Sequence, residues 1–141
     1  MTGPVARFGR RGVALILIGV AWVGFGLTLL AAPPVPDADA AIFMDYIPAV
    51  WQFAAWAFTG MVAVVAGARR PWQWVGYIAA TIMPILRATS FAWSTIMWLV
   101  PGAPEGDSRS VGAGLMWTAL IGLVLVVGSW PDTTHLPEAA P

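Results

Sequence analysis

The chain has no cysteine, no lysine and one histidine, and only 10% of its 141 residues are charged. Without cysteine it cannot form a disulfide, use a thiol as a nucleophile or bind an iron–sulfur cluster. The histidine, His135, stands alone in the tail and makes neither a metal site nor a catalytic base. The formal net charge is zero, which argues against a nucleic-acid-binding surface.

Catalytic motifs are missing as well. The glycines lie inside apolar stretches rather than in a phosphate-binding loop, and no Ser/His/Asp or Cys/His set can be assembled. No pair of carboxylates falls within an apolar stretch, as a coupled secondary transporter would need. We therefore expect a protein that is not an enzyme and has no cofactor, no metal and no evident small-molecule substrate.

What the chain does have is apolar surface, with 59% hydrophobic residues. A soluble domain would carry about a quarter charged residues, so this excess must face a lipid bilayer. Four stretches are long enough to cross it as helices, and proline-rich connections separate them. The sequence predicts an all-α integral membrane protein, one domain over 1–141, whose four transmembrane helices form a compact bundle with flexible termini at 1–9 and 131–141. The expected helices cover residues 11–32, 47–68, 72–100 and 110–130.

The arginines predict the orientation. Five of them lie before the first span or between the second and third: Arg7, Arg10, Arg11, Arg69 and Arg70. The other two connections hold one arginine, Arg109, and several acidic residues, among them Asp37, Asp39 and Asp45. The positive-inside rule therefore puts both termini in the cytoplasm. We expect a multi-pass protein of the inner (cytoplasmic) membrane of a cell.

Cleavage of the first span is the alternative. The run Ala38-Asp39-Ala40 has the small residues of a signal-peptidase site. The apolar run from Val13 to Ala32 is longer than the usual core of a signal peptide, which favours a retained span.

Tryptophans fall into two groups. One group lies near predicted span ends, where the ring prefers the membrane interface: Trp51, Trp72, Trp74, Trp98 and Trp130. The other lies deeper in the spans and is expected to fill helix packing: Trp22, Trp56, Trp93 and Trp117.

Small residues recur at regular spacing in every span, and helices in lipid associate where small residues let backbones approach. In the first span Gly12, Gly19 and Gly26 are seven apart. The other three spans show spacings of four: Ala55, Thr59, Ala63 and Gly67, then Gly76, Ala80, Pro84, Ala88 and Ala92, then Gly114, Thr118 and Gly122. We expect these ridges to meet within one bundle; alternatively, one of them mediates assembly into a homo-oligomer.

Arg87 is the one charged residue in the interior of a predicted span, away from the span ends, and it lies midway along the third. A charge near the bilayer midplane costs about 2.5–3.5 kcal/mol on insertion scales, so it needs polar company. Ser94 shares its helix face, with Pro84 and Ser90 alongside, and Pro84 frees a backbone carbonyl near Ala80. This face should look into the bundle, with water, carbonyls or another subunit around the guanidinium. Arg87 snorkels beside a proline kink, lines a hydrated path or an intersubunit contact, or marks a span whose boundary is misplaced.

The segment Met83–Trp93, followed by Leu99–Gly102 and by the ending Gly128–Pro131, resembles small four-span membrane proteins of actinobacterial phages that are regarded as holin-like. A GC-rich source such as an actinobacterium or its phage would also fit the use of arginine in place of lysine. The resemblance implies monomers that accumulate in the inner membrane, oligomerise and permeabilise it during host lysis. The acidic, proline-containing tail differs from the strongly basic tail of many holins. Two alternatives stay open, a non-lytic accessory or scaffold protein that binds a larger membrane partner and a small channel or transporter subunit.

Reporter fusions test the predicted orientation. Alkaline phosphatase fused to either end should be inactive, and green fluorescent protein at either end should fluoresce, because both ends are expected in the cytoplasm. Two ends in opposite compartments would contradict four crossings.

Overall fold

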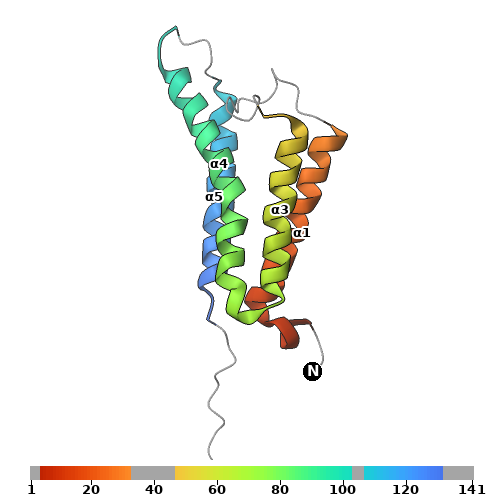
Figure 1. Cartoon of the computed structure of the whole chain (residues 1–141). Coiled ribbons are helices and arrows are strands. Elements are labelled where there is room, and N and C mark those ends of the chain that lie inside the picture. Colours follow the sequence, from red (N-terminus) through yellow and green to blue (C-terminus); the bar gives the residue numbers. More distant parts are fainter. Residues whose placement is uncertain (1–3, 33–46, 103–106, 132–141) are drawn as a thin grey trace, which may run out of the picture.

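A computed structural model describes residues 4–32, 47–102 and 107–131. Within these ranges four helices are long and apolar enough to cross a membrane, as the sequence predicts. They run up and down, and the end that holds Arg10, Arg11, Arg69 and Arg70 is called the arginine end below (Figure 1). The opposite end is called the far end. The elements are α1 (Pro4–Ala31), α3 (Ala49–Gly67), the short 3-10 helix η1 (Arg70–Trp72), α4 (Gln73–Leu99) and α5 (Arg109–Ser129).

The first helix differs from the expected range, because α1 begins at Pro4 rather than near residue 11. Proline suits the first position of a helix, where its missing N–H is not needed. Gly9 then interrupts α1 with φ 74° and ψ 167°, a conformation that other residues rarely adopt. The continuous membrane-length segment is Phe8–Ala31, so helix covers part of the range 1–9 that the sequence assigned to a terminus. The possible cleavage run Ala38–Ala40 and the tail after Pro131 lie outside the described residues.

Glycines bring α1 and α3 into backbone contact along their length. A Cβ atom added to Gly60 would lie 2.6 Å from the carbonyl oxygen of Gly19, and one added to Gly67 would lie 2.7 Å from that of Gly12. Seven residues after Gly19, a Cβ on Gly26 would lie 3.1 Å from the Cβ of Trp56. The seven-residue spacing predicted for α1 therefore continues in α3, and such spacing keeps one seam between two helices.

A freed carbonyl links α1 to α4. Pro84 has no N–H, so the carbonyl oxygen of Ala80 loses its usual partner in the helix. The indole Nε1 of Trp22 donates to that oxygen at 2.9 Å. The sequence predicted the freed carbonyl, and the structure shows that a tryptophan from α1 uses it.

The four-residue ridges are only partly buried. In α3, Thr59, Ala63 and Gly67 are buried and Ala55 is half-buried, but the closest approach to α1 involves Gly60, which the predicted ridge omits. A spacing of four advances about 40° per step around a helix, so such a ridge drifts off a straight seam.

The same drift separates the ends of the other two ridges. In α4, Gly76, Ala80 and Pro84 are buried, whereas Ala88 is half-buried and Ala92 is exposed. In α5, Thr118 and Gly122 are exposed, and no atom lies within 4 Å of a Cβ built on Gly122. Gly114, by contrast, is half-buried, and a Cβ built on it would lie 3.4 Å from the Cβ of Phe91 in α4. The expectation that the ridges of all four spans meet inside the bundle therefore holds only for the first residue of the α5 ridge.

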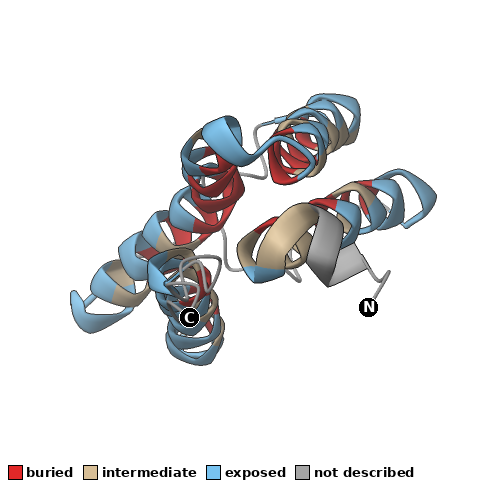
Figure 2. Ribbon diagram, turned by 90° about the horizontal axis from the view of Figure 1, so that it is seen from below, coloured by how far each residue is buried: buried red, intermediate tan, exposed pale blue. Residues whose placement is uncertain are grey.

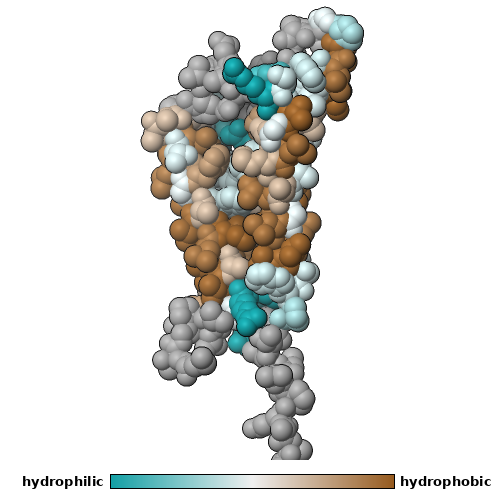
Figure 3. Space-filling view, turned by 180° about the vertical axis from the view of Figure 1, so that it is seen from behind, coloured by the Kyte–Doolittle hydropathy of each residue, from teal (hydrophilic) through white to brown (hydrophobic). Residues whose placement is uncertain are grey.

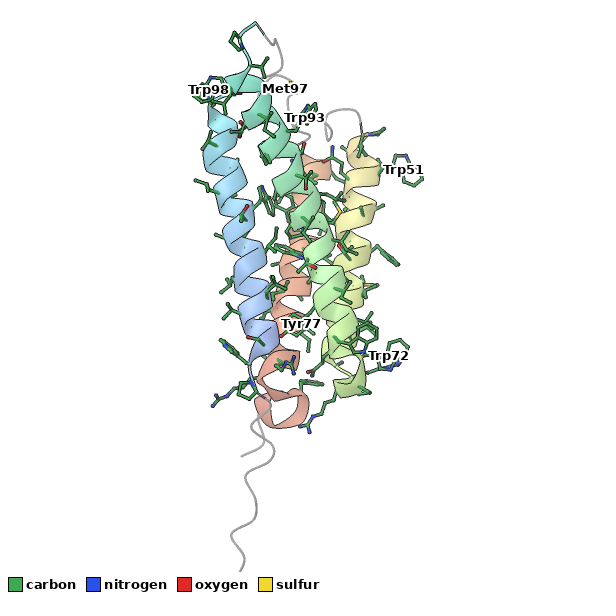
Figure 4. All side chains as sticks on the ribbon, turned by 90° about the vertical axis from the view of Figure 1, so that its left-hand side faces the viewer. Trp51, Trp72, Tyr77, Trp93, Met97 and Trp98 are labelled. Atoms are coloured by element: carbon green, nitrogen blue, oxygen red, sulfur yellow. The ribbon has the colours of Figure 1, made fainter. Side chains whose placement is uncertain are left out.

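The tryptophans follow the predicted division with one exception. Trp22, Trp56 and Trp117 are buried and meet edge-on or tilted, with ring centroids 5.2 Å apart for Trp22 and Trp56 and 5.7 Å for Trp56 and Trp117. Trp93, expected in this group, is 40% exposed. The exposed rings project outward at both ends of the bundle, as Trp51, Trp72 and Trp98 show in Figure 4.

The surface has the layout of a membrane protein. Buried residues line the facing sides of the helices, and exposed residues lie on their outer sides (Figure 2). In the view of Figure 3 a broad hydrophobic band covers the middle of the molecule, and hydrophilic residues gather toward its ends. The fold is thus that of a small polytopic membrane protein.

Two identical substitutions test the glycine seam. Gly60→Ala should lower the free energy of unfolding by about 1–3 kcal/mol, because the new methyl group meets the backbone of α1 and the helices must separate. Gly122→Ala meets no atom and should be neutral or slightly stabilising, since alanine favours helix. Unfolding of the purified protein in mixed detergent micelles measures both, and equal stabilities would contradict the seam.

Candidate functional site

A buried hydrogen bond between two polar side chains joins α4 to α3. Arg87 is 4% exposed, and its Nη2 donates to the side-chain oxygen Oε1 of Gln52 at 3.1 Å. The amide nitrogen of Gln52 donates in turn to the carbonyl oxygen of Ile47 at 2.9 Å, just before α3 begins. The amide is thereby held with its oxygen toward the guanidinium, an arrangement that satisfies a buried cation in part.

The contact also sets the depth of Arg87. Gln52 is the fourth residue of α3, so it lies about 5 Å from the far end of that helix at 1.5 Å per residue. Arg87 lies near the middle of α4, but α4 has 27 residues against 19 in α3 and extends well past α3. The arginine is therefore near the far end of the α1–α3 pair rather than at mid-height, where the sequence placed it. A position closer to one interface lowers the cost of the charge.

Two serines continue the polar face of α4 toward the far end. Ser90 is 1% exposed and Ser94 is fully buried, and neither hydroxyl makes a hydrogen bond to any of the residues that the structure describes. Pro84 is also fully buried on this face, one turn before Arg87. The structure therefore buries all four residues that the sequence grouped together, Pro84, Arg87, Ser90 and Ser94. Buried hydroxyls without partners are uncommon in proteins.

The threonines of the spans have a structural explanation. Each hydroxyl donates to a carbonyl three or four residues earlier in its own helix, at 2.8–2.9 Å for the nearest acceptor. This holds for Thr59, Thr81, Thr89, Thr95 and Thr118. Thr95 also contacts Ser110 of α5, with their oxygens 3.0 Å apart, and so ties the two helices together near the far end.

A second polar cluster closes the arginine end. Arg11 of α1 donates to the carbonyl oxygen of Gly128 in α5, and the hydroxyl of Tyr77 donates to the carbonyl oxygen of Arg11 at 3.1 Å. Gln73 donates to the carbonyl oxygen of Phe8 at 3.2 Å. These bonds fasten the two helical hairpins to each other at the same end as the exposed Arg10, Arg69 and Arg70.

Chemically, these groups donate and accept hydrogen bonds and carry positive charge. No group of three or more metal-binding side chains occurs among the residues that the structure describes. Such groups can join helices by hydrogen bonds, and they can also bind water or an anion.

Sequence reasoning missed Gln52 and Gln73. Both are buried amides at 5% exposure. Gln52 donates to the carbonyl oxygen of Ile47, just before its own helix, and Gln73 donates to that of Phe8 in α1. The available signal was that glutamine is costly in hydrocarbon and occurs in these helices only at these two places in the described residues. Pairing Gln52 with Arg87 would have required the register of α3 against α4, which the sequence alone does not supply.

In comparisons with known proteins, no protein-family model, no curated protein and no solved structure matches this chain.

A double-mutant cycle tests the Arg87–Gln52 contact. Gln52→Leu should lower the free energy of unfolding by about 1.5–3 kcal/mol, because it leaves the buried guanidinium short of an acceptor. Adding Arg87→Leu should recover part of that loss, because both polar partners are then gone.

The matched control is Gln73→Leu, whose amide bonds at the other end of the bundle. Its cost should be the same with or without Arg87→Leu, since distant sites add independently. A cycle in which Gln52→Leu and Arg87→Leu also add independently would show that the two residues do not stabilise each other.

Proposed function

We propose that the protein acts by association of helices within the membrane, and that its assembly into homo-oligomers through α5 permeabilises the cytoplasmic membrane in the manner of holin-like proteins. It does so without catalysis. The observation that supports this proposal is the outer face of α5, which the bundle leaves uncovered and which includes the exposed small residues Gly112, Thr118 and Gly122.

The attachment of α5 to the bundle is narrow. Its buried residues are Ser110, Trp117, Val124 and Val127. In the most apolar part of α5, 17% of the residues are buried. The corresponding value for the most apolar part of Arg70–Leu99, the segment that contains α4, is 56%. Most of α5 therefore faces lipid or another protein.

Small residues on the exposed side would let a second helix approach closely. Gly112 and Gly122 are exposed with no atom near a built Cβ. Beside them, a shallow groove of about 330 Å³ runs between α4 and α5, with Ala92, Gly114 and Thr118 among its lining residues. Close backbone approach at such residues is the main means of helix association in lipid.

The polar face of α4, formed by Arg87, Ser90 and Ser94, would favour entry of water into the assembled state. Arg87 and the two buried serines are enclosed in the single bundle. If α4 and α5 separate from α1 and α3 on assembly, this face gains water and the hydroxyls gain partners. Permeabilisation would then follow from rearrangement of the hairpins and would need no active site.

A second candidate function rests on the same α5 face. The protein could use it to bind a larger membrane partner as a non-lytic accessory or scaffold subunit. The enclosed Arg87–Gln52 contact favours this candidate, because a helix bundle with a satisfied arginine can act as a stable unit. A channel or transporter subunit has less support, since the buried side chains that bond between helices, Arg87 with Gln52 and then Gln73 and Tyr77, lie toward the two ends of the bundle.

Cross-linking and induced expression test the first proposal together. Because the chain contains no cysteine, Gly122→Cys introduces a single thiol on α5. Oxidation in membranes should yield a covalent dimer, whereas Leu17→Cys on the exposed side of α1 should stay monomeric. Induction of the unmodified chain should collapse the membrane potential abruptly, as a potential-sensitive dye reports.

A bulky residue on α5 should prevent both effects. Gly122→Leu should abolish assembly and delay or abolish the collapse, because its side chain keeps a second helix at a distance. Gly24→Leu is the matched control, since Gly24 is exposed on α1 with no atom near it. Cross-linking without loss of the membrane potential would exclude permeabilisation and favour the scaffold.

A further inference from the structure

An apolar groove lies on the outer side of α3, away from the α5 face. It has a volume of about 370 Å³, and its lining includes Phe58, Met61, Val65, Arg69, Trp72 and Val75. The α3 side chains are well exposed, with Phe58 at 70%, Met61 at 62% and Val65 at 52%. The volume lies within the range of small-molecule sites, which begins at about 300 Å³.

The groove has the length of one membrane leaflet. Phe58 and Arg69 are eleven residues apart, and α3 ends between them at Gly67. At 1.5 Å per residue this is about 16 Å, close to half of a hydrocarbon core about 30 Å thick. The groove therefore reaches from the arginine end to about mid-membrane, the depth that one acyl chain occupies.

Its open end carries a cation and an interfacial aromatic ring. Arg69 is exposed just after the end of α3, with Arg70 next to it. Trp72 is 57% exposed and projects away from the bundle beside the arginine end (Figure 4). Tryptophan prefers the level of lipid headgroups, so the guanidinium of Arg69 lies where phosphates are found.

From this combination we infer that the groove binds one anionic glycerophospholipid, with an acyl chain along α3 and the phosphate on Arg69. The charge of the arginine selects an anionic headgroup, and the apolar walls select a chain-bearing ligand over free phosphate. Basic residues after a helix also stabilise its C-terminus and orient the chain in the membrane. Neither of those roles requires an apolar groove that ends at the arginine.

Native mass spectrometry of the full chain in neutral detergent tests this site. The protein is titrated with an equimolar mixture of phosphatidylglycerol and phosphatidylcholine that carry the same acyl chains. Phosphatidylglycerol should be retained preferentially, and Arg69→Gln should reduce that preference about fivefold, the weight of one basic residue at an anionic surface. Arg69→Lys should retain most of the preference because it keeps the charge.

Two matched controls separate this site from general attraction. Arg109→Gln removes an exposed arginine at the far end and should leave the preference unchanged. Val65→Trp fills the groove and should abolish the retained lipid even with Arg69 present, whereas Leu125→Trp on the exposed side of α5 should not.

Any one of four results would overturn the inference, three of them from the lipid titration and one from cross-linking. The first is equal retention of the two lipids, and the second is an equal loss in Arg69→Gln and Arg109→Gln. The third is competition by glycerol phosphate, which lacks an acyl chain, at the same concentration as the lipid. If instead Val65→Cys cross-links to a second copy regardless of added lipid, the groove is covered by protein and the lipid site is excluded.

Discussion

In hydrocarbon, apolar side chains gain nothing by leaving the solvent, so helices hold together only where atoms approach closely or share hydrogen bonds. The seam between α1 and α3 meets this requirement through glycine facing glycine at Gly19 and Gly60 and again at Gly12 and Gly67. Once these two helices are in contact, Trp22 is positioned to bond the carbonyl oxygen of Ala80, and Gln52 is positioned to accept from Arg87. The α4–α5 hairpin is thereby attached to a pair that is already packed.

Much of the fold could be predicted because a lipid bilayer requires long apolar helices, and these can be recognised in the sequence. Length and hydropathy are properties of each segment alone, so the four membrane-length helices followed from the sequence. The freed carbonyl at Ala80 and the backbone-bonded threonines are also local, since each depends on residues within one turn.

What could not be predicted depends on how the helices are placed against one another. The partner of Arg87 lies 35 residues away, and the distance along the chain says nothing about their relative height. The α5 ridge looked like the others in sequence but has no helix opposite Gly122. Trp93 lies within a span by position, yet its place on the helix circumference exposes it. The function of the protein could not be predicted for the same reason. It depends on which molecules contact the outer surface of the bundle, and the sequence does not identify them.

The unequal lengths of the helices bear on the surrounding bilayer. α3 is about 28 Å long and α4 about 40 Å, as their 19 and 27 residues imply at 1.5 Å each. A hydrocarbon core of one thickness cannot match both, so lipid must thin beside the shorter helix, thicken beside the longer one, or let the longer one tilt. Hydrophobic mismatch of this kind costs a fraction of a kcal/mol per Å and makes a protein sensitive to membrane thickness. The bundle therefore carries a built-in preference among membranes that is independent of any binding surface.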